Sequence, residues 1–295
     1  MLPLVLFCKS YSVDLKRLVR LAQSVHKFNT ENIPFYISVP LTEIQLFEER
    51  LVGLDVHVIP DNLIIEHNPN IKQSDFDLLP GNLGQQIVKS EFWRLRLSTS
   101  YLCLDSDAVF IREFRTEDYL YNKNVPYTVM NEAHDLLGDA LSRNKPEILR
   151  NFQKEAAKVQ GLLGRAGKAY SFGPMPMVWH HEVWASLEAE YLRPQGMSFL
   201  DAILLAPLES RWYGEALLKF SAIPVLPSEP FFKVYHYGWQ LDQDNTRGIH
   251  LSDLANLYTG VIYQSSWDRA MDWPIEGGNT ASRLARRFRR AIGRA

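Results

Sequence analysis

Two aspartates about a third of the way along the chain have the type and spacing that metal-assisted chemistry needs. Asp105 and Asp107 are separated only by Ser106, and they directly follow the apolar run 101–104. Two carboxylates in this arrangement can share one hard cation, Mg²⁺ or Mn²⁺, with the oxygens of a diphosphate. Asp and Ser are also common in an ordinary turn after a strand. The pattern therefore allows both a metal site and a simple turn.

The segments before these aspartates alternate between predicted strands and predicted helices. The predicted strands are 3–8, 34–39, 56–59 and 101–104, and the predicted helices are 14–28, 42–53 and 84–96. Thr42 and Gln45 have the spacing of a capping box at the start of the second helix. This alternation indicates a parallel sheet covered by helices, in which ligands bind at the carboxyl ends of the strands. Asp105 and Asp107 follow such an end.

The second half of the chain is less regular but contains no linker long enough to separate two domains. Helical stretches are predicted at 145–159, 183–191 and within 199–219, and a strand rich in aromatic residues at 231–239. We therefore expect one continuous α/β domain over residues 1–275, followed by a basic tail at 276–295.

Composition narrows the class of protein further. The chain has 295 residues and a formal net charge of −2, which argues against a nucleic-acid partner. Cys8 and Cys103 lie in apolar runs, so we expect buried, reduced thiols in a cytoplasmic protein. The apolar start of the chain lacks the basic region of a signal peptide, and no apolar run reaches the roughly 20 residues of a membrane span.

The charge balance is broken locally at the end of the chain. Residues 283–294 carry six arginines and no acid, and Leu284, Phe288 and Ile292 recur every four residues. A helix here would present an apolar stripe flanked by arginines, which is typical of a helix that lies on an anionic membrane surface. This predicts peripheral attachment at the inner membrane face. The alternative is a solvated basic tail.

Three short motifs resemble one family of enzymes. The sequence Leu104-Asp105-Ser106-Asp107, after about a hundred residues of α/β pattern, resembles the GT-A class of nucleotide-sugar glycosyltransferases. Gly84-Gln85-Gln86-Ile87-Val88-Lys89 resembles the Gln-Gln-x-x-Lys helix of a group of bacterial surface-polysaccharide glycosyltransferase-like proteins. Lys9-Ser10-Tyr11 fits the first nucleotide-contacting loop of that group. The resemblance spans about residues 3–240 and implies a GT-A-like, Rossmann-type mixed sheet flanked by helices.

The resemblance also implies which residues bind the donor and the metal. The residues expected to contact the donor nucleotide are Lys9, Ser10, Tyr11, Gln85, Gln86, Lys89, Asp105 and Ser106. The ligands expected for Mn²⁺ or Mg²⁺ are Asp105, Asp107 and a late histidine, His236, which is followed closely by Gly238. An ammonium such as that of Lys89 can pair with a phosphate. His236 could equally be a core histidine among its aromatic neighbours.

Further roles follow from the same resemblance. Glu209 precedes a Tyr-Gly pair and is the expected general base, with Asp201 and Glu215 as fallback candidates. Trp179, His180 and His181 fall in the region that lies near the acceptor in the GT-A class, and Trp179 could stack on a sugar ring. These aromatic residues could also simply belong to the core.

The resulting hypothesis is a metal-dependent glycosyltransferase. It would move a sugar from a nucleoside-diphosphate sugar, with UDP favoured, to a hydroxyl of a glycan or lipid-linked glycan, with inversion. One alternative is a haloacid-dehalogenase-type phosphatase, because residues 105–109 also match the Asp-x-Asp-x-Val opening of that class, with Asp105 as nucleophile. Another is an inactive nucleotide- or carbohydrate-binding module.

Overall fold

The computed structural model describes residues 1–142, 144, 146–236 and 238–264. The predicted tail at 276–295, with its expected membrane-binding segment 283–294, lies outside the described residues, as does the end of the predicted 1–275 domain. Within the described part of the chain, no helix combines the length and the apolar character needed to cross a membrane.

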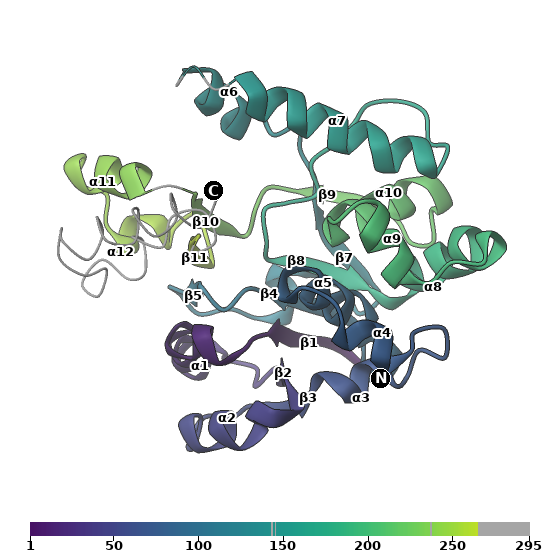
Figure 1. Ribbon diagram of the computed structural model, residues 1–295. Helices are drawn as coiled ribbons and strands as arrows, with labels where there is room; N and C mark the ends of the chain where they lie inside the picture. Colours follow the sequence, from purple (N-terminus) through teal and green to yellow (C-terminus); the bar gives the residue numbers. More distant parts are fainter. Residues whose placement is uncertain (143, 145, 237, 265–295) are drawn as a thin grey trace, which may run out of the picture.

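A five-stranded mixed sheet forms the centre of the protein (Figure 1). Its strands, in spatial order, are β3 (His57–Pro60), β2 (Phe35–Val39), β1 (Leu2–Lys9), β4 (Ser98–Leu104) and β8 (Met177–His180). The first four are parallel, and β8 is antiparallel to β4. The middle of β1 and all but one residue of β4 are buried, as expected for near-continuous apolar runs covered on both faces. The predicted α/β class and the mixed sheet flanked by helices are confirmed.

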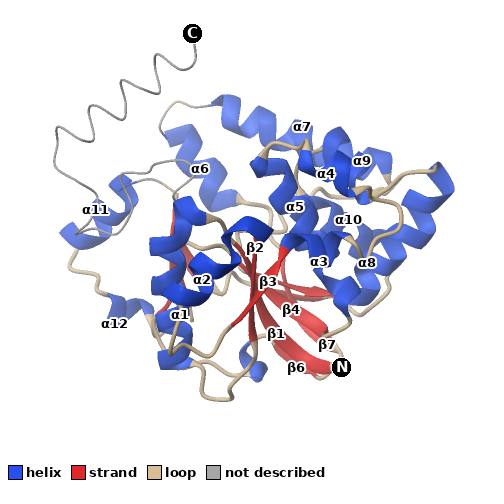
Figure 2. Cartoon of the chain, turned by 60° about the horizontal axis from the view of Figure 1, so that its bottom comes forward, coloured by secondary structure: helices blue, strands red, loops and turns tan. Residues whose placement is uncertain are grey.

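Helices cover this sheet on both sides (Figures 1 and 2). The helices α1 (Leu15–Phe28) and α2 (Ile44–Arg50) follow β1 and β2 and lie on one side. The helix α5 (Gly81–Glu91) precedes β4 and lies on the other. Because the chain runs outward from β1 to β2 and β3, and then returns to place β4 on the opposite side of β1, the strand order reverses between β1 and β4. In open α/β sheets, such a reversal leaves a crevice at the carboxyl ends of the two strands.

Two smaller sheets flank the central one. The first contains β10 (Phe232–Tyr235), β11 (Gly260–Tyr263) and β5 (Ala108–Phe110), and the second contains β6 (Leu120–Asn122), β7 (Val125–Val129) and β9 (Leu226–Ser228). Because β5 begins directly after Asp107, the first small sheet connects the aspartate loop to the late part of the chain. The remaining helices are α3 (Asp61–Ile65), α4 (Gln73–Asp77), α6 (His134–Ser142), α7 (Pro146–Leu162), α8 (His181–Leu187), α9 (Phe199–Leu205), α10 (Glu209–Phe220), α11 (Gly238–Thr246) and α12 (Leu251–Leu254).

One hydrophobic core joins the two halves of the chain. The Phe7 ring of β1 stacks on Phe92 with centroids 3.9 Å apart, and both contact Tyr101 of β4. Tyr101 packs edge to face against Trp179 of β8, and the same buried cluster continues into α10. This core packs β1, β4, β8 and α10 together, and a smaller second cluster lies around Tyr235, Leu254, Val261 and Tyr263.

Several element boundaries differ from the sequence predictions. The predicted strand 231–239 ends at Tyr235, and α11 begins at Gly238. The helix predicted to start at Gly84 begins at Gly81 after Pro80, so Gly84 lies inside α5. The predicted capping box is absent, because α2 begins at Ile44 and the Gln45 amide donates to Glu49 instead.

The position of α10 depends on a close approach at Gly214. A Cβ added at Gly214 would collide with the ring of Phe172, which is buried. We therefore expect Gly214→Ala to lower the free energy of unfolding by about 1–3 kcal/mol, the usual cost of overpacking a core. Denaturant unfolding followed by circular dichroism would measure this loss.

Gly161 of α7 provides a matched control, because a Cβ there meets nothing within 4 Å. Gly161→Ala should be neutral or stabilise by up to about 1 kcal/mol, since alanine is the better helix former. Equal behaviour of the two variants would contradict the proposed close approach at Gly214.

Candidate active site

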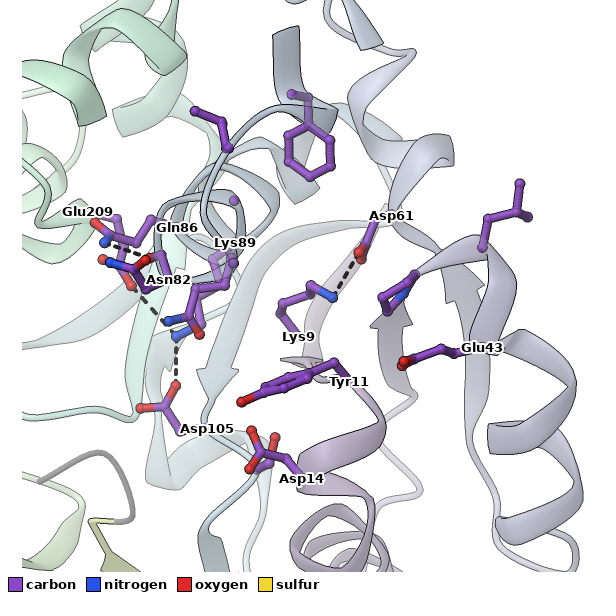
Figure 3. Close-up of a pocket in the computed structure, with 18 of the residues that line it drawn as sticks. Lys9, Tyr11, Asp14, Glu43, Asp61, Asn82, Gln86, Lys89, Asp105 and Glu209 are labelled. Atoms are coloured by element: carbon purple, nitrogen blue, oxygen red, sulfur yellow. Dashed lines mark hydrogen bonds and ion pairs between the residues drawn. The ribbon is translucent and has the colours of Figure 1, made fainter. Parts of the chain in front are cut away.

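A cavity of about 930 Å³ opens at the carboxyl ends of the parallel strands (Figure 3). Most of the residues singled out in the sequence line it. These are Lys9, Tyr11, Gln85, Gln86, Lys89, Asp105, Ser106, Asp107 and Glu209. The end of β1 contributes Lys9, the loop after it contributes Tyr11, and the loop after β4 contributes the two aspartates. The cavity thus occupies the crevice at which the strand order reverses.

The loops after β1 and β4 are tied together by buried hydroxyl groups. Ser106 Oγ donates to Ser10 Oγ at 3.1 Å, so Ser10 acts below the cavity and does not line it. Cys8 Sγ lies 3.8 Å from Ser106 Oγ. Burial raises the pKa of the Cys8 thiol to about 12, so it stays protonated, and Cys8 and Cys103 are both buried free thiols as the sequence indicates.

A buried lysine lies between two carboxylates at one end of the cavity (Figure 3). Lys89 Nζ donates to Asp105 Oδ1 at 2.6 Å and lies 3.6 Å from Glu209 Oε1. Burial alone would lower the pKa of this ammonium, but the two carboxylates outweigh burial and hold it well above its usual value. Lys89 is therefore a permanent cation that joins α5, the end of β4 and the start of α10.

Glu209 is the first residue of α10 and is largely buried. Burial raises the pKa of its carboxyl group above the ordinary value, although the neighbouring Lys89 ammonium opposes this shift. A carboxylate with a raised pKa accepts a proton more readily than an exposed glutamate does. Glu209 consequently combines access to the cavity with the basicity that a general base needs.

A second lysine is paired at the opposite end of the cavity (Figure 3). Lys9 Nζ lies 2.8 Å from Asp61 Oδ2 and donates to the backbone oxygen of Ser10 at 2.7 Å. Ser38 Oγ also donates to Asp61, and burial raises the pKa of the Asp61 carboxyl group despite Lys9. The two lysines of the cavity are thus each matched to carboxylates from other elements.

Some residues that line the cavity are not among those predicted from the sequence. Glu43 and Asp61 follow β2 and β3, and Glu43 accepts hydrogen bonds from the backbone nitrogen and the hydroxyl of Ser12 at 2.7 and 2.6 Å. The rule that identified Asp105, a polar residue at the carboxyl end of a predicted strand, also fits Asp61, whereas Glu43 lies inside the predicted helix 42–53. Gln264 had no such signal, because β11 brings it to the cavity by pairing with β5.

The predicted acceptor residues lie elsewhere. Trp179 is fully buried, packed edge to face against Tyr101 and Trp184. His180 caps α8, its Nδ1 accepting from the Glu182 backbone at 3.2 Å, and burial lowers its pKa to about 4. His181 stacks on His180 with centroids 4.8 Å apart. Trp179 and His180 are therefore core residues, and Trp179 offers no exposed face on which a sugar could stack.

The fallback bases are also engaged away from the cavity. Asp201 forms a capping box with Ser198 at the start of α9. Glu215 is fully buried and forms an ion pair with Arg165. Neither lines the cavity, so of the three acids named from the sequence only Glu209 is placed to act in it.

His236 reaches the same edge as the aspartates but does not line the cavity. It follows β10, whose end lies beside the end of β11 and the start of β5. Its backbone nitrogen donates to Gln240 Oε1 at 2.7 Å. Among the described residues, no group of three or more His, Cys, Asp or Glu side chains is arranged to hold a metal ion. Asp105 and Asp107 nevertheless supply two carboxylates to one edge of the cavity, which is the oxygen-rich donor set that Mg²⁺ and Mn²⁺ prefer.

A family model described as a family of unknown function, DUF6492, matches residues 1–233. The chain belongs to this family. No curated protein matches the chain.

Solved structures of glycosyltransferases are similar in fold. The apo structure of the bifunctional glycosyltransferase WbbM aligns with a TM-score of 0.53 and 12% identity, covering 88% of this chain and 45% of WbbM. This chain thus matches less than half of that enzyme. The apo structure of mouse xyloside xylosyltransferase 1 aligns with a TM-score of 0.47 and 6% sequence identity, covering 89% of this chain and 98% of the mouse chain. The galactosyltransferase LgtC, in complex with donor and acceptor sugar analogs, aligns with a TM-score of 0.46 and 13% sequence identity, covering 88% of this chain and 86% of LgtC. The DUF6492 chain has the GT-A-like glycosyltransferase fold that the sequence resemblance implied.

The burial of Glu209 predicts a pH-dependent cost in stability. Its folded-state pKa lies above the ordinary value of 4.5, so the unfolded chain releases this proton first as the pH rises. The protonated Glu209 side chain therefore contributes to the free energy of unfolding at low pH. This contribution is lost as the pH rises from about 4.5 through the folded-state pKa. We expect Glu209→Gln to be more stable than the wild type at neutral pH, with the advantage shrinking toward about pH 4.

Urea unfolding of both proteins at several pH values would measure this difference. Asp201→Asn is the control, because that carboxylate serves an exposed helix cap and not the cavity. A Glu209→Gln advantage that stays constant with pH would contradict the raised pKa.

Proposed function

We propose that this DUF6492 protein is a metal-dependent glycosyltransferase. It would move a sugar from a nucleoside-diphosphate sugar to a hydroxyl of a glycan or lipid-linked glycan. The observation that carries the proposal is that Asp105, Asp107 and Glu209 line one cavity at the strand-order reversal of a GT-A-like fold. The phosphatase alternative is less well supported, because the aspartates follow the fourth strand in chain order of a sheet similar to that of a glycosyltransferase.

The charge of the cavity supports metal dependence. Its described lining includes seven carboxylates and two ammonium groups, and each ammonium is paired with carboxylates. The carboxylates are Asp14, Glu43, Asp61, Asp77, Asp105, Asp107 and Glu209. A diphosphate entering this surplus of negative charge would be repelled. Asp105 and Asp107 would hold Mg²⁺ or Mn²⁺, and the cation would neutralise the charge of the departing nucleoside diphosphate.

The chain's own residues would then divide the remaining work. Tyr11, which projects into the cavity, and Gln85 would contact the nucleotide, for which we favour UDP (Figure 3). Glu209 would accept the proton of the acceptor hydroxyl while the hydroxyl oxygen attacks the anomeric carbon of the donor sugar. The bond from that carbon to the diphosphate oxygen breaks on the opposite side, which inverts the configuration. Lipid-linked acceptors would be met at an anionic membrane surface bound by residues 283–294.

Nucleotide binding should require a divalent cation. We expect UDP or GDP to raise the melting temperature of the protein only when Mn²⁺ is also present, because the cation offsets the cavity's negative charge. Asp105→Asn and Asp107→Asn should each abolish this stabilisation, whereas Asp201→Asn, which alters only a helix cap, should keep it. A thermal-shift panel tests all of these variants. Equal stabilisation without metal would contradict the metal requirement.

Loss of the Glu209 carboxylate should abolish transfer but not donor binding. We expect Glu209→Gln to lower the rate of sugar transfer by roughly 10²–10⁴-fold, the usual contribution of a general base. The thermal shift with UDP should persist in this variant at saturating Mn²⁺. The assay is the release of nucleoside diphosphate from a panel of nucleotide sugars in the presence of acceptor glycans.

Other outcomes of that assay would support other functions. Wild-type protein that binds UDP with Mn²⁺ but transfers from no donor to any acceptor would indicate a binding module. Cleavage of an aryl phosphate, lost in Asp105→Asn, would indicate a phosphatase.

A further inference from the structure

The Lys89 ammonium lies where it would compete with a bound metal ion for the Asp105 carboxylate. Its hydrogen bond uses Asp105 Oδ1, an oxygen of one of the two proposed metal ligands. The Lys89 side chain is only 5% exposed and that of Asp105 is 28% exposed, so water screens the ammonium only in part from a second cation bound at the same carboxylate. Two cations that share one partly desolvated carboxylate repel each other.

The backbone of Lys89 is fixed, whereas its ammonium has a second partner within reach. Tyr101 Oη donates to the Lys89 backbone oxygen at 2.7 Å, which anchors the last turn of α5 to β4. The Glu209 carboxylate lies 3.6 Å from Nζ on the other side from Asp105 (Figure 3). An ammonium–carboxylate hydrogen bond is about 2.7–2.9 Å long, so a side-chain movement of roughly 1 Å would complete one with Glu209.

We propose that Lys89 is an internal counter-ion that competes with the divalent cation for Asp105, and that cation binding transfers its ammonium to Glu209. The proposal rests on the proposed function, because it needs Asp105 to bind a metal. Lys89 is thus a positioning residue that links occupancy of the metal site to the carboxylate proposed as the base. It neutralises Asp105 while the cation is absent and holds Glu209 when the cation is present.

Lys9 provides a matched control within the same cavity. Its side chain is 9% exposed, close to the 5% of Lys89, and it pairs with a buried carboxylate, Asp61, at 2.8 Å. Removing either lysine changes the charge of the cavity by the same amount. Only the removal of Lys89 frees an oxygen of Asp105.

The experiment is a titration of the full-length protein with Mn²⁺ alone, followed by the electron paramagnetic resonance signal of the free ion. We expect Lys89→Gln to bind Mn²⁺ at least roughly tenfold more tightly than the wild type, equivalent to about 1.4 kcal/mol. Lys9→Gln should bind it only about two- to threefold more tightly, through the general change in potential. Equal gains in the two variants, or no gain in Lys89→Gln, would overturn the proposal.

A second pair of variants tests the transfer to Glu209 and does not depend on the folding of Lys89→Gln. Glu209→Gln removes the receiving carboxylate, so Mn²⁺ binding should weaken by roughly tenfold. Asp61→Asn removes a buried carboxylate that pairs with Lys9 and not with Lys89. This variant should weaken Mn²⁺ binding by a clearly smaller factor. Equal losses in Glu209→Gln and Asp61→Asn would overturn the transfer.

Different Mn²⁺-binding results would overturn the competition at Asp105 and the proposed metal dependence. Wild-type protein that binds Mn²⁺ no more weakly than Lys89→Gln overturns the competition and leaves the glycosyltransferase proposal intact. Absence of Mn²⁺ binding in the wild type and in every variant, with each shown to be folded by circular dichroism, overturns both the competition and the proposed metal dependence.

Discussion

The candidate site depends on one buried ammonium held between two carboxylates from distant parts of the chain. Lys89 comes from α5, Asp105 from the end of β4 and Glu209 from the start of α10. Charged groups are buried only when they are matched, because an isolated charge in the interior is costly. The pairing of Lys89 with both carboxylates therefore requires α5, the end of β4 and the start of α10 to meet at one point. The Tyr101 hydroxyl and the close packing of Gly214 against Phe172 fix two of those elements.

The parallel half of the fold was predictable because each of its strands is a short apolar run that ends in polar residues. That pattern located β1, β2, β3 and β4 to within two or three residues. It failed for β8, whose residues Met177–His180 are equally apolar, because this strand lies outside the strand–helix alternation of the first half and pairs antiparallel to β4. The resemblance places Trp179 and His180 near the acceptor and leaves a core role open, and the pairing of β8 with β4 buries both in the core.

The site was predictable where it depends on local position along a strand and not where it depends on long-range pairing. Asp105 and Lys89 follow from the resemblance and from the strand end. Asp61 lies two residues after the predicted strand 56–59 and could have been predicted by the same rule. Gln264 was not predictable, because it enters the cavity through the pairing of β11 with β5, which joins segments more than a hundred residues apart.

The two edges of the central sheet affect whether strands of other chains can add to it. Exposed strand edges act as templates on which other chains can add strands and aggregate. The outer strand β3 is only four residues long and ends in Pro60, which has no backbone N–H to offer a new neighbour. On the opposite border, β7 packs beside β8. Both edges of the central sheet are therefore poorly suited to adding a strand from another chain.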